Sequence, residues 1–505
     1  MKKIILTALF FMLLYEDHAQ EINFIKDSIV SYIETGMEKW KIPGLGILVI
    51  KDGEVLIKRG FGYRDLEHKL PFDIETSFFI ASNTKLFTGT MLSNLAYQGR
   101  LKLDDRVRKF IPEFQLNNPI HTQQVTLSDL LSHRIGTDEF QGDLTYWNST
   151  LSRKEIMNKM RQMKAEYVFR QDFGYCNSCY MTAGEIGAKI TGISWEKYIT
   201  DSIFMPLGMT HSSALSNDAK KLFPNLAVPY TKDYKGDLAI MPHDKWDNLG
   251  PAASIISNLN DMEKWARFQL DSGKVNGKVV FPWEVLEFTR QGRSILSTSL
   301  NTEHNMHFLA YGLGLFMSDF NGNQVYWHTG GSSGMVSNFC FVPEKKLGIV
   351  IFANNDEQLF FEKLRVQILD HYLGIAYENQ SERELPYYRK DVQKEKDRVE
   401  KLFARVIKHN SRPNLSAYTG EYTNPQYGKI NLNQKGEELE INFEHHPKLK
   451  GKLQKLDKGE WLLSFNNVGY GIYATSFKNK DGKPRSFEIR VKDFIEHSVY
   501  TFTKK

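Results

Sequence analysis

Apolar residues are spaced along this chain so that strand-like runs stand near both ends of a long helical middle. Two runs, 45–50 and 54–58, are separated by Lys51-Asp52-Gly53, a turn sequence that predicts a β-hairpin. Later runs rich in aromatic and β-branched residues predict three more strands, at 325–327, 339–342 and 348–352. Between them, 82–98 and 178–190 are helix candidates, and a glycine follows soon after each one.

This order of elements predicts an α+β fold. Strands from both termini would complete one antiparallel sheet, with helices flanking it and an all-α region beside it. From 377 to 414 charges of both signs alternate, which predicts a solvated helical linker. In 415–505 apolar residues alternate with period two, as in Leu439, Ile441 and Phe443. Short strands at regular spacing predict a small C-terminal β-barrel or sandwich.

The first residues of the chain are typical of an export signal. Lys2 and Lys3 precede an apolar run, 4–14, and Ala19 stands at the expected cleavage point. The run is too short for a permanent membrane span, although retention as an uncleaved anchor is the alternative. We therefore expect a periplasmic or secreted protein without stable membrane insertion. The predicted divisions are a signal peptide (1–19), a main domain (20–376), the linker (377–414) and the β domain (415–505).

Composition narrows the classes of function. The chain has 505 residues, 41% hydrophobic and 25% charged, which is the profile of a soluble multidomain protein. Its net charge of +5 is small and its basic residues are dispersed, so nucleic acid is not an expected partner.

Cysteines and histidines give no sign of a metal or of another cofactor. The chain has three cysteines, too few to hold a protein of this size together. Cys176 and Cys179 form a C-x-x-C motif, which we interpret as buried thiols on one helix face, with a strained disulfide as the alternative. No second pair and no histidine cluster with zinc spacing accompanies them.

The first candidate for chemistry is Ser82-Asn83-Thr84-Lys85, at the beginning of a predicted helix. Residues three apart share a helical face, so the Lys85 amine can reach the Ser82 hydroxyl. That hydroxyl needs a proton acceptor, and a lysine can serve only if burial or nearby cations lower its pKa. A capping serine near an exposed lysine gives the same letters, as at Ser194 and Lys197, so the motif alone is weak.

Two further elements follow along the chain. Tyr175 could take and return a proton, and Asn177 could bind both a lysine amine and a substrate amide. In His328-Thr329-Gly330-Gly331, the glycines would let a substrate backbone approach an edge strand, and Thr329 offers a hydroxyl to a carboxylate. The alternatives are an aromatic core residue beside a capping asparagine, and a tight turn with an exposed histidine.

In this order the three elements resemble those of the penicillin-recognising serine hydrolases, the group of class C β-lactamases and D-Ala-D-Ala carboxypeptidases. The resemblance covers about 22–372 and implies the β-lactamase/transpeptidase-like α+β fold. The C-terminal domain resembles the lipocalin-like barrel that follows the hydrolase domain in some bacterial members. The segments that carry the likeness are Phe-Ile-Ala-Ser-Asn-Thr-Lys (79–85), Thr-Leu-Ser-Asp-Leu-Leu-Ser-His (126–133), Phe-Met-Pro-Leu-Gly-Met (204–209) and Val-Pro-Glu (342–344).

The resemblance also implies a role for each residue. Ser82 would be the nucleophile that accepts the acyl group, Lys85 its base partner and Tyr175 the proton shuttle. Asn177 would bind the substrate amide, and the backbone N–H groups of Ser82 and Gly331 would form the oxyanion hole. The substrate-binding positions on the strand would be His328, Thr329, Gly330 and Gly331.

Departures from the family pattern bear on the substrate. Class C β-lactamases usually carry lysine at the place of His328, whereas His-Thr-Gly resembles the carboxypeptidases, aminopeptidases and esterases of the group. Arg134-Ile135-Gly136 replaces the usual Thr-Ser-Gly. We expect cleavage of an amide bond in a small peptide-like substrate. An esterase, a β-lactamase or a penicillin-binding sensor with slow turnover are the alternatives, and the oligomeric state stays open.

Two polar clusters are interpreted as non-catalytic. Asp138, Glu139 and Asp143 are expected on an acidic surface loop, and Glu444-His445-His446 is expected in a solvated turn that binds no metal. The C-terminal domain would either narrow the mouth of the active site or serve only as a packing module.

Overall fold

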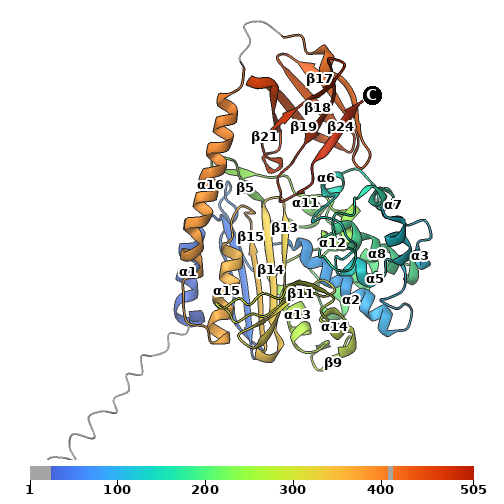
Figure 1. The fold of residues 1–505 in the computed structure, drawn as a ribbon. Helices are drawn as coiled ribbons and strands as arrows, with labels where there is room; N and C mark the ends of the chain where they lie inside the picture. The colour runs from blue at the N-terminus through green and yellow to red at the C-terminus, as the bar shows by residue number, and fades with distance from the viewer. Residues whose placement is uncertain (1–23, 408–412) are drawn as a thin grey trace, which may run out of the picture.

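The structure, a computed structural model, describes residues 24–407 and 413–505 and shows a large α+β domain with a smaller β domain at one end (Figure 1). The expected signal peptide, 1–19, lies outside the described residues. Within them, no helix combines the length and the apolar character that crossing a membrane requires.

The main domain is built on a nine-stranded antiparallel sheet. Within this sheet β1 pairs with β15 on one side and with β2 on the other, so strands from both ends of the domain complete one sheet, as predicted. In spatial order the strands are β10 (Ser294–Ser297), β11 (Leu309–Tyr311), β12 (Phe316–Phe320), β13 (Asn323–Ser332), β14 (Met335–Val342), β15 (Leu347–Ala353), β1 (Gly44–Lys51), β2 (Glu54–Asp65) and β3 (Leu70–Pro71).

Helices cover both faces of this sheet, which explains why β1 is apolar on both sides. On one face lie α1 (Ile29–Trp40) and α15 (Phe360–Leu373), packed so closely that a Cβ on Gly36 would overlap the Phe360 ring. On the other face lie α2 (Thr84–Tyr97) and α13 (Leu259–Leu270), and Phe87 of α2 stacks on Trp265 of α13 at 3.9 Å.

A mainly helical region stands beside the sheet (Figure 1). Its longest helix, α8 (Asn177–Thr191), is buried over most of its length and carries Asn177 at its first position. The shorter helices are α3 (Val107–Phe110), α4 (Pro119–Gln124), α5 (Leu127–Leu131), α6 (Asp143–Tyr146), α7 (Arg153–Lys159), α9 (Trp195–Ile199), α10 (Met205–Leu207), α11 (Ala219–Leu222), α12 (Gly250–Ala253) and α14 (Trp283–Thr289). Short strand pairs are β4 (Phe78–Phe79) with β7 (Ile256–Ser257), β5 (Tyr230–Lys232) with β6 (Leu238–Ile240), and β8 (Lys274–Val275) with β9 (Lys278–Val279).

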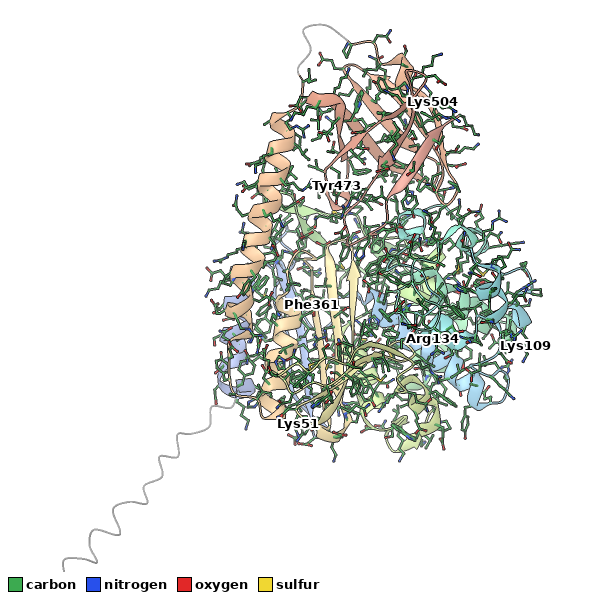
Figure 2. All side chains as sticks on the ribbon, in the orientation of Figure 1. Lys51, Lys109, Arg134, Phe361, Tyr473 and Lys504 are labelled. Atoms are coloured by element: carbon green, nitrogen blue, oxygen red, sulfur yellow. The ribbon has the colours of Figure 1, made fainter. Side chains whose placement is uncertain are left out.

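A long helix, α16 (Gln380–Ala404), runs along the main domain and up to the β domain (Figure 1). Where it reaches the β domain, the Arg398 guanidinium lies over the Tyr473 ring, 5.3 Å from its centroid; Tyr473 is labelled in Figure 2.

The β domain is a nearly closed barrel of nine strands. The two sides of its sheet approach one another where the Thr475 hydroxyl of β21 donates a hydrogen bond to the carbonyl oxygen of Glu488 over 2.7 Å. In spatial order its strands are β21 (Tyr473–Ser476), β20 (Glu460–Phe465), β19 (His446–Lys455), β18 (Glu438–Phe443), β17 (Gly428–Lys435), β16 (Gly420–Asn424), β24 (Tyr500–Lys504), β23 (Lys483–Ile489) and β22 (Lys478–Lys480). The predicted fold class, an α+β domain followed by a small barrel, is confirmed.

Candidate active site

Ser82 lies in a tight 3₁₀ turn, Ala81–Asn83, immediately before α2. The preceding residue, Ala81, has φ 48°, a left-handed backbone conformation that a residue with a Cβ seldom adopts. Strand β13 presses against this turn, because a Cβ on Gly330 would stand only 2.2 Å from the carbonyl oxygen of Ile80. Ser82 is therefore held on a strained turn, and β13 can lie this close to the turn only because residue 330 is a glycine.

Lys85 is buried and its amine is fully engaged. Its Nζ donates to Ser82 Oγ over 3.0 Å, to Asn177 Oδ1 over 2.7 Å and to the carbonyl oxygen of Ala252 over 3.0 Å. Burial lowers the pKa of Lys85 to about 7, although the carboxylate of Asp143 acts in the opposite direction. At neutral pH much of this amine is uncharged, so it can accept the proton of the Ser82 hydroxyl.

Tyr175 lies against the same amine, with Lys85 Nζ 4.7 Å from the centroid of its ring. Burial and the nearby Tyr311 raise the pKa of Tyr175 well above its ordinary value, and a hydrogen bond with Ser82 opposes them. The phenol thus keeps its proton in the resting protein. It is placed to return a proton, whereas Lys85 is placed to take one.

His133 positions Tyr175, a role that sequence reasoning missed. Its ring stacks on that of Tyr175 at 4.3 Å, and its Nδ1 accepts a hydrogen bond from the backbone N–H of Cys176 over 3.0 Å. Burial lowers the pKa of His133 well below its ordinary value, so the ring is neutral. The Ser-His at 132–133 ends a segment that resembles the family, but nothing in its letters shows that the histidine faces Tyr175.

The His328–Gly331 segment lies on the free part of β13. Strand β12 pairs with β13 only as far as Trp327, so within the described residues 328–332 pair on one side alone, with β14. The His328 ring is buried and forms a hydrogen bond with the Tyr311 hydroxyl over 3.0 Å. Burial lowers the pKa of His328 to about 3, and Lys85 adds to the effect, so this histidine brings no positive charge to the site. Thr329 is partly exposed beside it.

The expectation that Asp143 belongs to a surface loop is wrong. Asp143 is 1% exposed, and its Oδ2 accepts a hydrogen bond from Asn177 Nδ2 over 2.5 Å. Burial raises the pKa of Asp143 to about 7, while Asn177 and Lys85 lower it. The packing of α6 against α8 directs this carboxylate into the protein. A run of acidic residues in the sequence does not show which of them will be buried. Asp143 and Lys85 are thus held by the same amide, Asn177.

The expectation of a solvated turn at Glu444-His445-His446 is wrong for His446. This ring is buried between the two domains, where it forms hydrogen bonds with the Tyr427 hydroxyl and with the carbonyl oxygen of Trp147, each over 2.7 Å. It attaches the β domain to the main domain. Among residues 24–407 and 413–505, no group of three or more histidine, cysteine or acidic side chains is placed to hold a metal ion.

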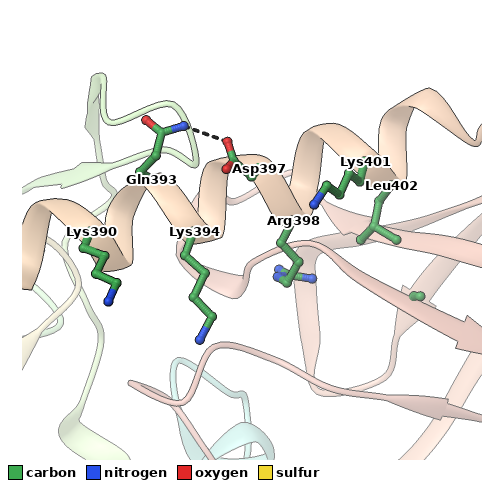
Figure 3. A pocket seen from close by; sticks show the side chains of 8 residues that line it. Lys390, Gln393, Lys394, Asp397, Arg398, Lys401 and Leu402 are labelled. Carbon is green, nitrogen blue, oxygen red and sulfur yellow. Dashed lines mark hydrogen bonds between the residues drawn. The ribbon is translucent and has the colours of Figure 1, made fainter.

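A broad hollow on α16 is separate from this site. Figure 3 shows lysine side chains and Arg398 along the helix beside it. The Gln393 amide donates a hydrogen bond to Asp397 over 2.7 Å. The hollow contains no residue of the Ser82 site. It is lined by Lys390, Gln393, Lys394, Asp397, Arg398, Lys401, Leu402 and Ala474.

Comparison with known protein families agrees with this geometry. Residues 29–372, most of the chain, match the family described as β-lactamase. The chain belongs to the β-lactamase family. Its C-terminal part, 404–504, matches a family described as a domain of unknown function, DUF3471.

Relatives of this chain include Protein flp of Staphylococcus aureus (strain MRSA252), 31% identical over 357 residues that span 69% of this chain and 67% of that protein. Unguisins hydrolase ungD of Aspergillus violaceofuscus is 25% identical to this chain, over 78% of this chain and 74% of that hydrolase. The octameric penicillin-binding protein homologue of Pyrococcus abyssi superimposes with a TM-score of 0.61 and 22% identity, covering 94% of this chain and 99% of that one, which shows a shared fold. These findings place the chain among β-lactamase-fold serine hydrolases.

Proposed function

We propose that the protein is a serine peptidase or amidase that cleaves a small peptide-like substrate through an acyl-enzyme on Ser82. The observation that carries the proposal is the buried Lys85 amine, 3.0 Å from Ser82 Oγ and with a pKa of about 7. Such an amine is a suitable base at neutral pH, and general base catalysis of this kind contributes roughly 10²- to 10⁴-fold in rate.

In the proposed reaction, Ser82 Oγ attacks the carbonyl carbon while its proton moves to Lys85 Nζ. The N–H groups of Ser82 and Gly331 hold the oxyanion. Tyr175 gives its phenolic proton to the leaving nitrogen as the C–N bond breaks, and it takes the proton held on Lys85 Nζ in return, which leaves Lys85 free as a base. Water then attacks the acyl-enzyme ester and gives a proton to Lys85 Nζ, and as the ester bond breaks that proton returns to Ser82 Oγ. Asn177 orients the amine throughout.

One feature favours a peptide over an ester, and a second distinguishes the site from that of the class C β-lactamases. The Thr329 hydroxyl is partly exposed on the free edge of β13, where it could bind the terminal carboxylate of a peptide. His328 is neutral, so it lacks the charge that the lysine usual in class C β-lactamases would supply there. We also retain export to the periplasm as part of the proposal, from the charged start and apolar run of the sequence.

A fluorophosphonate probe tests the nucleophile directly. The wild type is expected to be labelled at Ser82, and Ser82→Ala should remove the label. Ser194→Ala is the matched control, because Ser194 is also followed by a lysine three residues later but only caps α9 through the Lys197 N–H. Labelling that survives in Ser82→Ala, or that is lost in Ser194→Ala, would reject the assignment. A set of peptides, D-aminoacyl amides, p-nitrophenyl esters and nitrocefin, compared by kcat/KM, tests the substrate class.

A further inference from the structure

One segment of the β domain, residues 490–499 between β23 and β24, reaches the mouth of the candidate active site. Its Phe494 ring lies over Gly331 of β13, since a Cβ on Gly331 would stand 2.9 Å from Phe494 Cε2 and 3.0 Å from Cζ. Apart from Gly331 and its chain neighbours, only Phe494 atoms lie within 4 Å of that position in the described part of the chain. The ring also meets Trp147 edge-on, with centroids 6.0 Å apart. This aromatic side chain is therefore the cover of β13 at Gly331.

The segment is tied to the main domain on both sides of Phe494. Before it, Lys492 forms an ion pair with Glu357. After it, Glu496 is fully buried and accepts hydrogen bonds from the backbone N–H groups of Gly142 over 2.9 Å and Leu144 over 2.8 Å. Phe494 is thus a fixed wall, because its neighbours on either side are bonded to the main domain.

The same segment is linked to the catalytic side chains. Glu496 bonds to the backbone on either side of Asp143, and Asp143 in turn binds Asn177, which holds Lys85. The His497 ring of this segment also contacts the Phe140 ring, with centroids 5.7 Å apart, and the centroid of the Phe140 ring lies 5.1 Å from that of Tyr175. The wall is therefore fixed in place relative to the reacting groups.

Behind the wall lies a cavity between the main domain, α16 and the β domain. Its volume is about 610 Å³, and Phe494 lines it together with Lys232, Tyr388, Arg398 and Tyr473. One side chain therefore both covers Gly331 and lines a space large enough for several residues of a peptide. Shortening Phe494 would open the edge of β13 toward this cavity.

We propose that Phe494 determines substrate specificity by limiting how far the acyl half of the substrate extends past Gly331. This inference rests on the proposed function, in which the carbonyl lies between Ser82 and Gly331. An extended chain advances about 3.3 Å per residue, so a second acyl residue running along the free edge of β13 would meet the ring. The favoured substrate is then one with a single residue or a small acyl group before the scissile bond.

The test compares two esters with the same leaving group, p-nitrophenyl acetate and the p-nitrophenyl ester of an N-acetylated dipeptide. In the full-length protein, Phe494→Ala is expected to raise kcat/KM for the dipeptide ester at least tenfold relative to the acetate. Phe403→Ala is the matched control, because Phe403 lies on α16 and is 38% exposed, as Phe494 is. It should leave the ratio unchanged. Phe494→Leu, a milder change, should shift the ratio in the same direction, and it provides the test if the alanine variant folds poorly.

The outcomes separate this inference from the proposed function. Hydrolysis of the acetate that depends on Ser82, with the same dipeptide-to-acetate ratio in the wild type and both Phe494 variants, would overturn the role of Phe494 alone. An equal shift in Phe403→Ala would also overturn it. Hydrolysis and labelling that are unaffected by Ser82→Ala would overturn the proposed function, and this inference with it.

Discussion

Gly330→Ala probes the close contact between β13 and the turn that carries Ser82. A Cβ at this position would stand 2.2 Å from the carbonyl oxygen of Ile80 and 2.4 Å from Ser337 Oγ. Ordinary van der Waals contacts begin near 3.4 Å, so the strand or the turn must retreat by roughly 1 Å. The nearer of these two atoms is the backbone oxygen of Ile80, so the clash cannot be relieved by rotating a flexible side chain.

The expected losses of stability and activity differ in size. Overpacking of this kind destabilises by about 1–3 kcal/mol, which lowers Tm by roughly 2–4 °C for each kcal/mol in a domain of moderate size. A displacement of about 1 Å at a reacting atom costs on the order of 100-fold in rate. The folded fraction therefore stays high at 25 °C while the reactivity of Ser82 falls. Thermal melting and the second-order rate of labelling by a fluorophosphonate measure the two effects separately.

Gly348→Ala is the control on the same sheet. A Cβ on Gly348 of β15 would meet Leu270 Cδ1, a flexible side-chain atom, at 3.2 Å. We expect a small change in Tm and an unchanged labelling rate. Labelling of Gly330→Ala at the wild-type rate would refute the idea that β13 positions the nucleophile, and an equal loss in Gly348→Ala would attribute the effect to the sheet as a whole.

Two further predictions concern the pH dependence of labelling. In the wild type the labelling rate should rise with pH through a midpoint near 7, because only the uncharged form of Lys85 accepts a proton and its pKa is about 7. In Lys85→Arg the side chain stays charged, so the labelling rate should fall by roughly 10²- to 10⁴-fold. A rate independent of pH between about 5 and 9 would contradict this role. Asp143→Asn keeps an acceptor for Asn177 but removes a charge that raises the pKa of Lys85, so the midpoint should move down by roughly one pH unit. Asp138→Asn, on the same loop but hydrogen-bonded to Tyr167, should leave the midpoint in place, and an upward shift in Asp143→Asn would count against the proposed electrostatics.

Local sequence patterns predicted the elements that carry the site. The hairpin at Lys51-Asp52-Gly53 is present, with Asp52 and Gly53 at positive φ as that turn requires. The predicted helix at 178–190 is α8, Asn177–Thr191, and Gly192 closes it in the left-handed conformation. The predicted strand at 54–58 extends further, to Asp65, because pairing with β1 and β3 continues through positions that, apart from the buried Phe61, are exposed or half-buried and have no apolar pattern.

The sequence by itself determined which residues are available for chemistry, since the order of Ser82-x-x-Lys85, Tyr175-x-Asn177 and His328-Thr329-Gly330 is fixed by the chain. The tertiary structure alone decided their electrostatics. Burial by distant segments, with Asn177 and the carbonyl oxygen of Ala252 as partners, sets the pKa of Lys85 near 7, and no local pattern reports how much water is excluded from an amine. The same holds for Asp143 and Phe494, whose places depend on contacts between segments far apart in sequence, Asp143 with α8 and Phe494 with β13.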